Sequence, residues 1–326
     1  MPYGTVNADL ITTSDGVSSA GLYGFKNRII NGKMDIDQRY GGASVTPVSA
    51  QYLVDRWQAG LTVASKFSAQ QNAGAVTPPS GFSNYLGLTS LSAYSILTSD
   101  SFRIQQPIEG VNVADLAWGT ASAAPITISF WVRSSLTGTF GGSLSNSAGT
   151  RSYPFTYTIS AANTWEQKSV TISGDTTGTW LTTNGVGIYV IFSLGTGATY
   201  SAAAGAWASG FYLSATGATS VVGTSGATLF ITGVQLERGS TATSFDVRDY
   251  GRELEMCQRY YGLYNTLVFS LPAAYGVFFY PVTMRTTPTW SQQSGSALTL
   301  TGAGINSGFV TGAATTGFSY SVSSEL

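Results

Sequence analysis

Five runs in the middle of the chain alternate apolar and polar residues with the two-residue period of half-buried β-strands. They cover residues 126–133, 155–159, 170–172, 186–192 and 229–237. Turns rich in Gly, Ser and Thr separate the runs, and no helical pattern lies between them. Strands at such short spacing, with no helices to connect parallel neighbours, predict an all-β sandwich or barrel.

The composition favours a folded protein and narrows the function. Hydrophobic residues make up 43% of the 326 residues and aromatic residues 13%, whereas disordered chains lack both and carry high net charge. The formal net charge is −1 and only 10% of the residues are charged, which argues against the basic face that nucleic-acid binding needs. A neutral surface rich in Thr and aromatic residues suits sugars or protein subunits better than charged ligands.

The chain has no His and a single Cys, Cys257. The absence of His removes Ser–His–Asp and Cys–His catalysis and every His-containing zinc site. A single Cys removes disulfide frameworks and fits a reducing compartment. Asp35 and Asp37 alone supply too few oxygens for calcium, so we interpret them as turn-capping and ion-pairing residues beside Arg39. We expect no cofactor and no metal.

The N-terminal residues resemble no secretory signal, because they lack a basic region followed by an apolar region. No run of about 18 uninterrupted apolar residues occurs, so we expect no membrane insertion. The sequence therefore predicts a protein made in the cytoplasm without an export signal of its own.

Changes of pattern divide the chain into three parts. Residues 1–34 are Gly-rich without clear periodicity, and we interpret them as an attachment arm that becomes ordered against a partner; a floppy terminus is the alternative. Residues 35–248 form the β-sandwich. Residues 249–326 begin with a short helix near 249–262, which places Leu254 and Cys257 on one apolar stripe, and continue as a C-terminal β region.

Several aromatic residues lie in loop sequence rich in Gly, Ser and Ala: Trp180, Tyr200, Trp207, Phe211 and Tyr212. Sugars stack their apolar C–H faces on aromatic rings held in loops. Trp180, Tyr200, Trp207 and Tyr212 are therefore the candidate ligand-binding residues. The alternative is that these rings pin long loops to the sandwich or fill a subunit interface.

Catalysis is not expected, and no catalytic residue is assigned. A glycosidase needs two carboxylates about 5–10 Å apart. Between residues 116 and 245 the acids are Glu166, Asp175 and Glu237, and nothing in the sequence brings two of them together. Serine nucleophiles lack a His base, and no glycine-rich phosphate-binding motif occurs.

Six short motifs follow one another along the chain. They are NRIINGKMDIDQR at 27–39, YLVDRW at 52–57, ISFWVR at 128–133, NTWEQK at 163–168, ITGVQLE at 231–237 and LEMCQRYY at 254–261. In this order they resemble a family of tailed-bacteriophage virion proteins, which are tail fibres or minor structural proteins with a carbohydrate-binding-module-like jelly roll. The resemblance implies a jelly-roll β-sandwich in a phage particle, commonly as a homotrimer.

The same resemblance bears on single residues. Trp131 and Trp165 match the inner-strand and post-turn tryptophans of carbohydrate-binding jelly rolls, and core packing is the favoured interpretation of both. Trp57 is also assigned to the core. Arg133 and Glu237 are interpreted as a partly buried ion pair between strands, because an unpaired buried charge is costly.

The sequence as a whole predicts a non-enzymatic bacteriophage virion protein, a tail fibre or receptor-binding appendage. It would attach to other virion proteins through residues 1–34 and contact host-surface glycan through its jelly roll and C-terminal part. Two alternatives stay open: a capsid decoration or head fibre with no host ligand, and a polysaccharide depolymerase spike. A homotrimer is expected because a surface so poor in charge needs partners to stay soluble.

Overall fold

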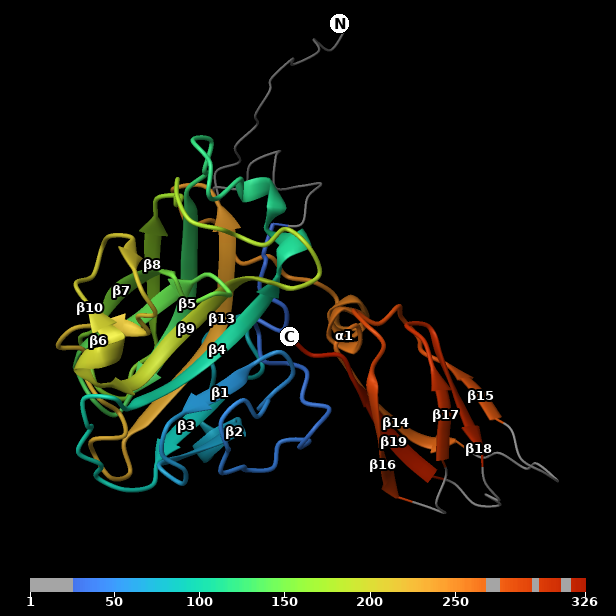
Figure 1. Ribbon diagram of the computed structural model, residues 1–326. Helices are drawn as coiled ribbons and strands as arrows, with labels where there is room; N and C mark the ends of the chain where they lie inside the picture. The colour runs from blue at the N-terminus through green and yellow to red at the C-terminus, as the bar shows by residue number, and fades with distance from the viewer. Residues whose placement is uncertain (1–25, 268–275, 295–298, 312–317) are drawn as a thin grey trace, which may run out of the picture.

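The structure is a computed structural model that describes residues 26–267, 276–294, 299–311 and 318–326. These residues form two β-units, and the only α-helix among them lies where the chain passes from one unit to the other (Figure 1). The described part of the chain contains no helix with the length and hydrophobicity of a membrane crossing. The expectation of an all-β protein with one short helix is confirmed.

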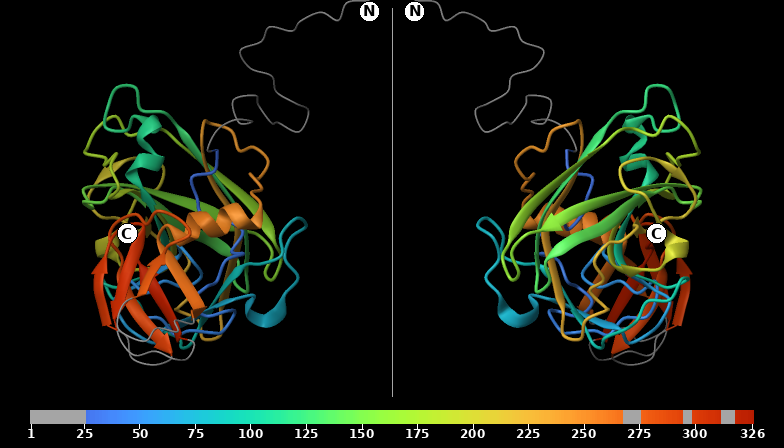
Figure 2. Two further views of the ribbon diagram at one scale, coloured as in Figure 1. Left: turned by 90° about the vertical axis from the view of Figure 1, so that its right-hand side faces the viewer. Right: turned by 90° about the vertical axis from the view of Figure 1, so that its left-hand side faces the viewer.

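The larger unit consists of two antiparallel sheets with the strand orders β1-β4-β9-β6-β7-β11 and β2-β3-β13-β5-β8. The first contains β1 (Gln58–Leu61), β4 (Ser101–Glu109), β9 (Val186–Thr196), β6 (Gly138–Ser145), β7 (Arg151–Ile159) and β11 (Ala208–Ser209). The second contains β2 (Phe67–Gln71), β3 (Leu86–Ser90), β13 (Thr228–Arg238), β5 (Ile126–Ser134) and β8 (Glu166–Ile172). The chain passes repeatedly between the two sheets, which lie face to face in Figures 1 and 2, so this unit is a jelly-roll sandwich.

The two-residue alternation decides which side chains fill the sandwich. On β5, Ile126, Ile128, Phe130 and Val132 are fully buried in the core, and the residues between them face the other side of the sheet. Phe130 meets Phe192 of the opposite sheet edge to face, with ring centroids 4.9 Å apart. A one-residue slip of β5 would turn this whole apolar set outward, so the sequence pattern fixes the register.

Short elements lie at the ends and edges of the sandwich. They are the paired two-residue strands β10 (Ser201–Ala202) and β12 (Ser214–Ala215), and the 3-10 turns η2 (Ala73–Ala75), η3 (Gly110–Asn112), η4 (Ala114–Leu116) and η5 (Ala198–Tyr200). Strand β12 contacts β6, β7 and β9. The segment from η5 to β12 therefore folds back over part of the outer face of the six-stranded sheet.

Residues 26–34 are not the free arm that their glycines suggested. Ile29 and Met34 are fully buried in the sandwich core, and Ile30 packs with Cys257 of the helix. The expectation of an arm is therefore wrong for residues 26–34, because apolar side chains anchor them in two clusters at once. Residues 1–25, the rest of the expected arm, lie outside the described residues.

Two asparagines fasten this N-terminal segment to its neighbours. Asn27 donates from Nδ2 to the carbonyl of Val234 at 3.1 Å, and its Oδ1 accepts from the amide of Leu236 at 3.1 Å. Asn31 donates from Nδ2 to the carbonyl of Asp55 at 2.9 Å. Both asparagines are buried. Their side chains satisfy backbone N–H and C=O groups of β13 and of the 52–57 turn in the way that a neighbouring strand would.

The helix α1 (Tyr250–Gln258) begins at an N-cap, where Asp249 Oδ1 accepts from the backbone amide of Arg252 at 3.0 Å. Cys257 lies on its buried face, in a cluster with Ile36 and Tyr260. The helix therefore packs between the N-terminal segment and the start of the smaller unit.

The smaller unit consists of two three-stranded antiparallel sheets, β14-β19-β16 and β15-β18-β17. Their strands are β14 (Tyr261–Leu267), β19 (Phe318–Ser323), β16 (Thr289–Ser294), β15 (Gly276–Phe279), β18 (Ser307–Thr311) and β17 (Thr299–Ala303). A separate hydrophobic cluster fills it: Phe278, Tyr280, Met284, Val310, Tyr320 and Val322. The C-terminal β region thus has a core of its own.

Buried charges join the two units. Arg56 is 1% exposed, pairs with Glu325 near the C-terminus, and lies 3.6 Å from the centre of the Tyr260 ring. Arg39 pairs with Asp55 at 3.1 Å and with Glu325 at 2.9 Å. The last residues of the chain therefore return to the jelly roll and hold the smaller unit against it (Figure 1).

Candidate functional site

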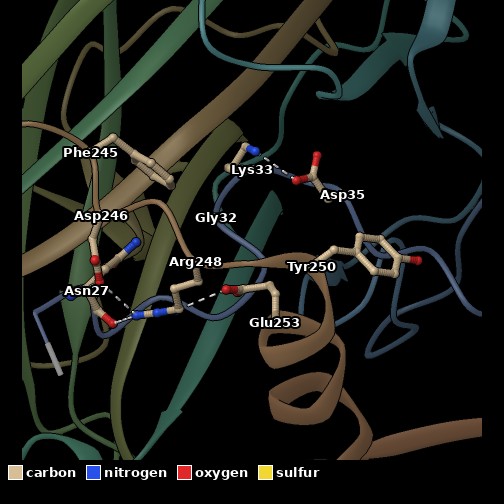
Figure 3. A pocket seen from close by; sticks show the side chains of 9 residues that line it. All are labelled: Asn27, Gly32, Lys33, Asp35, Phe245, Asp246, Arg248, Tyr250 and Glu253. Carbon is tan, nitrogen blue, oxygen red and sulfur yellow. Dashed lines mark hydrogen bonds and ion pairs between the residues drawn. The ribbon is translucent and has the colours of Figure 1, made fainter.

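The first pocket lies between the N-terminal segment and α1 (Figure 3). Its volume is about 80 Å³, and its lining is Asn27, Gly32, Lys33, Asp35, Phe245, Asp246, Arg248, Tyr250 and Glu253. Figure 3 shows the charges in pairs: Lys33 and Asp35 are 3.2 Å apart, and Arg248 lies 3.3 Å from Glu253. Ligand cavities measure about 300–1,000 Å³, so this small pocket, whose charged side chains all lie in ion pairs, is a structural junction.

A second pocket, which we call the sheet pocket, lies on the outer face of the six-stranded sheet and has a volume of about 340 Å³. Its lining is Arg103, Gln105, Ser147, Ala148, Gly149, Tyr189 and Phe211. The volume falls within the usual range for small-molecule sites, and the lining combines two aromatic rings with polar groups. The sheet pocket is therefore the candidate functional site.

The strand alternation positions the floor of the sheet pocket. On β4, Phe102 and Ile104 enter the core, so Arg103 and Gln105 point to the outer face. On β9, Ile188 and Val190 enter the core in the same way and leave Tyr189 outside. The β4–β9 register places Tyr189 opposite Pro107, diagonal to Gln105, so these outward side chains line one pocket.

The walls of the sheet pocket come from two loops. The β6–β7 turn supplies Ser147 to Gly149, and Phe211 comes from the segment that follows β11. Gly149 has φ of +64°, and a Cβ at this position would lie 3.1 Å from the Phe211 ring. The loops approach each other closely because glycine stands there. Ser152 holds the Phe211 segment to β7, since its Oγ donates to the carbonyl of Gly210 at 2.7 Å.

Arg103 is the cation of the sheet pocket. Its Nε donates to Gln105 Oε1 at 2.7 Å and its Nη1 to Ser101 Oγ at 3.1 Å, and the guanidinium carbon lies 5.8 Å from the centre of the Phe211 ring. Burial lowers the pKa of Arg103 to about 10, against the opposing influence of Tyr189. The guanidinium therefore stays charged at neutral pH, and no ion pair to it occurs among the described residues.

Trp180 and Trp207, two of the residues expected to bind ligand, lie elsewhere. Together with Trp118 they form a cluster in which each ring meets the others edge to face, with centroids 4.8–5.3 Å apart. Their indole N–H groups donate to the backbone carbonyls of residues 177 and 173. These rings pack against one another and against the loop backbone, and a role of Trp180 and Trp207 in ligand binding stays a prediction.

Of the other two expected ligand-binding residues, Tyr200 contacts a ring that lines the sheet pocket, and Tyr212 packs against the backbone of its own loop. The Tyr200 ring meets Phe211 edge to face, with centroids 6.3 Å apart, and so supports its wall from behind. The Tyr212 ring is half-buried and packs against Gly210, where a Cβ would lie 2.9 Å from it. Neither side chain is part of the lining.

Four of the five residues assigned to the core or to an ion pair, Trp131, Trp165, Arg133 and Glu237, are placed differently. Trp57 is fully buried, but Trp131 is only half-buried, on the outer face of β5 beside Gly233. Arg133 and Glu237 do not meet, because the β5–β13 register places Glu237 opposite Thr127. That position is about 20 Å along β5 from Arg133 at the usual rise of a strand.

These residues find other partners. Arg133 donates from Nε to the carbonyl of Asn163 at 3.0 Å, and Glu237 accepts from Thr243, whose amide and hydroxyl lie 2.9 and 2.7 Å from its two oxygens. Trp165, also half-buried, donates its N–H to the carbonyl of residue 77 at 2.9 Å. All of them are structural contacts, but they lie outside the sandwich core.

No group of three or more His, Cys, Asp or Glu residues that could hold a metal occurs in the described part of the chain. The lining of the sheet pocket contains no carboxylate. The arrangement can bind a ligand through ring contacts, amide and hydroxyl groups and one cation, and its lining supplies no acid–base pair for hydrolysis.

No protein-family model matches the chain, and no similar protein is found among curated proteins. Among solved structures, a putative sugar-binding protein from Bacteroides thetaiotaomicron has a TM-score of 0.39 and 12% identity over 66% of this chain and 100% of that chain. The carbohydrate-binding module TmCBM61 in complex with beta-1,4-galactotriose has a TM-score of 0.33 and 11% identity over 66% and 99%.

The enzymatically active domain of tailspike protein 4 of bacteriophage CBA120 has a TM-score of 0.36 and 12% identity over 65% of this chain. The match spans only 21% of that tailspike chain. The fold is similar to these jelly rolls. At such low identities and TM-scores, the assignment of the sandwich rests on this chain's own strand order.

Proposed function

We propose that this chain is a non-enzymatic glycan-binding protein and that the sheet pocket is its binding site. The observation that carries the proposal is an open cavity of about 340 Å³ in which the rings of Tyr189 and Phe211 stand beside the N–H donors of Arg103 that its contacts to Gln105 and Ser101 leave unused. A sugar ring offers an apolar face to an aromatic side chain and hydroxyl groups to polar ones. The lining of the sheet pocket matches both.

Binding rather than hydrolysis follows from the chemistry of the lining. A glycosidase places two carboxylates on either side of the scissile bond. The sheet pocket has none, and Glu109 at the end of β4 is committed to Arg259 at 2.8 Å and to the Tyr260 hydroxyl at 2.6 Å. We therefore propose that the chain has no enzymatic activity. Release of reducing sugar from a bound polysaccharide would contradict this.

A glycan array probed with the full chain tests the proposal. Tyr189→Ala and Phe211→Ala should each weaken binding to the retained glycans about tenfold or more, because each removes a ring at the centre of the contact. Trp180→Ala is the aromatic control outside the sheet pocket; assayed well below its own denaturation midpoint, it should leave the affinity unchanged. If Trp180→Ala abolishes binding and Tyr189→Ala does not, the site lies at the tryptophan cluster and this assignment is wrong.

We also propose a bacteriophage virion as the setting, in which the chain is a tail fibre or receptor-binding appendage. The order of the six sequence motifs supports this proposal. Residues 1–25 are the candidate attachment segment to other virion proteins, since residues 26–34 belong to the fold. Particles assembled with a chain that lacks residues 1–25 should contain none of it, and normal incorporation would reject the attachment role.

A homotrimer is the third part of the proposal. It is supported by the low share of charged residues, 10%, beside 43% hydrophobic residues. Light scattering coupled to size exclusion should give three times the chain mass of 34.1 kDa. A monomeric mass at micromolar concentration would contradict the trimer without affecting the assignment of the sheet pocket.

A further inference from the structure

The ligand class of the sheet pocket follows from the charge of its lining. Arg103 is the only ionised group there at neutral pH, because the other lining residues are Gln, Ser, Ala, Gly, Tyr and Phe. Two other partly buried arginines of the chain are neutralised: Arg151 lies 2.6 Å from Asp175, and Arg259 lies 2.8 Å from Glu109. Arg103 has no such carboxylate within the described residues, so the sheet pocket carries an uncompensated positive charge.

The guanidinium of Arg103 is held in place before any ligand arrives. Gln105 and Ser101 accept two of its hydrogen bonds, at 2.7 and 3.1 Å. Its underside lies against Gly60 of β1, where a Cβ would stand 2.5 Å from the guanidinium carbon. A group fixed in this way loses little freedom when it binds, which favours affinity.

Several N–H groups of Arg103 stay available. A guanidinium has five N–H donors in a planar fork, and the contacts to Gln105 and Ser101 use two of them. The remaining donors belong to Nη1 and Nη2, which together match the two oxygens of a carboxylate. Uncharged hydroxyl groups would use these donors without neutralising the charge.

We propose that the sheet pocket recognises an acidic glycan, with Arg103 binding the carboxylate of a sugar residue and Tyr189 and Phe211 contacting its ring. This inference rests on the proposed glycan-binding function and adds the charge of the ligand to it. The pairing would neutralise a cation that burial has partly removed from water. Such charge-assisted bonds are stronger than those between neutral groups.

The test uses the full chain and an array of acidic glycans, hexuronates and nonulosonates, each printed beside the same glycan with its carboxyl groups reduced to alcohols. At least one acidic glycan should be retained while its reduced partner is not. Arg103→Gln should weaken binding of that glycan by about 10- to 100-fold, the usual value of a hydrogen bond to a charged group. Arg103→Lys keeps the charge without the planar fork and should give an intermediate loss.

Arg133→Gln is the matched control. Arg133 also lies near a phenylalanine ring, 5.4 Å from the centre of Phe230, but on the outer face of the other sheet and outside the sheet pocket. Arg133→Gln should leave the affinity for the glycan unchanged. Equal denaturation midpoints of Arg103→Gln and Arg133→Gln would exclude a loss of fold as the cause of weaker binding.

Two results would overturn the inference, and they can be told apart. If acidic and reduced glycans bind equally, Tyr189→Ala abolishes binding and Arg103→Gln does not, the ligand is neutral and the glycan-binding function stands. If no glycan of either kind is retained, the proposed function fails and the inference fails with it.

Discussion

Removal of residues 26–34 should unfold the protein. Ile29, Ile30 and Met34 are 0%, 5% and 0% exposed, and burial of one such side chain is worth about 1.5–3 kcal/mol. Together they contribute roughly 5–9 kcal/mol, which is comparable to the whole stability of a typical domain, about 5–15 kcal/mol.

The deletion also leaves buried polar groups without partners. Gln106 exchanges two hydrogen bonds of 2.8 Å with the backbone of Ile30, and the Trp57 indole donates to the carbonyl of Asn31 at 3.1 Å. Each group left unpaired costs about 1–3 kcal/mol. These costs add to the lost burial, so no cooperatively folded jelly roll should remain.

Urea denaturation followed by tryptophan fluorescence compares the full chain with chains that begin at residue 26 and at residue 35. The chain from 26 should unfold cooperatively, and the chain from 35 should show no cooperative transition. Ile29→Ala in the chain from 26 should cost about 2–5 kcal/mol. A normal transition in the chain from 35 would refute the reasoning, because the burial would then carry no stability.

Three further predictions concern single residues. Burial raises the pKa of Asp55 to about 6, with Arg39 opposing it, so the folded state holds the proton longer than the unfolded chain does. Stability attributable to Asp55 therefore falls by about 2 kcal/mol as pH rises from 4 to 7. Over that range the free energy of unfolding of the native protein should fall relative to that of Asp55→Asn, and a constant difference would contradict this. Trp180→Ala removes a ring from the cluster with Trp118 and should cost about 3 kcal/mol, and an unchanged denaturation midpoint would mean that the cluster adds no stability. Burial raises the pKa of the Cys257 thiol, so a thiol reagent should label it only in denaturant, and rapid labelling of the native chain would be the contrary result.

The sandwich could be predicted because strand alternation is a local signal. The five expected runs became β5, β7, β8, β9 and β13, and the short helix expected near 249–262 is α1, Tyr250–Gln258. Buried strands carry this information in their own residues, since every second side chain must be apolar. The N-terminal segment was misjudged because its burial depends on partners more than 200 residues away, such as Val234 and Leu236.

The sheet pocket could not be found from loops alone. The aromatic residues in loop sequence led to the prediction of Trp180 and Trp207 as ligand-binding residues, and these two rings pack against each other. The floor of the sheet pocket comes from two strands instead. The alternation in 101–105 does hold a signal, since Arg103 and Gln105 face away from Phe102 and Ile104. Only the pairing of β4 with β9, which places Tyr189 opposite Pro107, reveals that Tyr189 belongs to the same pocket.

The six motifs and the lining of the sheet pocket have no residue in common. The residues that make the contacts of the fold therefore differ from those that line the candidate site. Motif residues Asn31, Arg56 and Tyr260 meet where the N-terminal segment, the 52–57 turn and the helix come together, so that junction explains their chemistry. Arg103 and Tyr189 lie outside every motif. A chain that kept the motifs and changed these two residues would keep this architecture and bind a different ligand. The motifs therefore carry contacts of the fold, and under the proposed function the outward residues of β4 and β9 would decide what the chain binds.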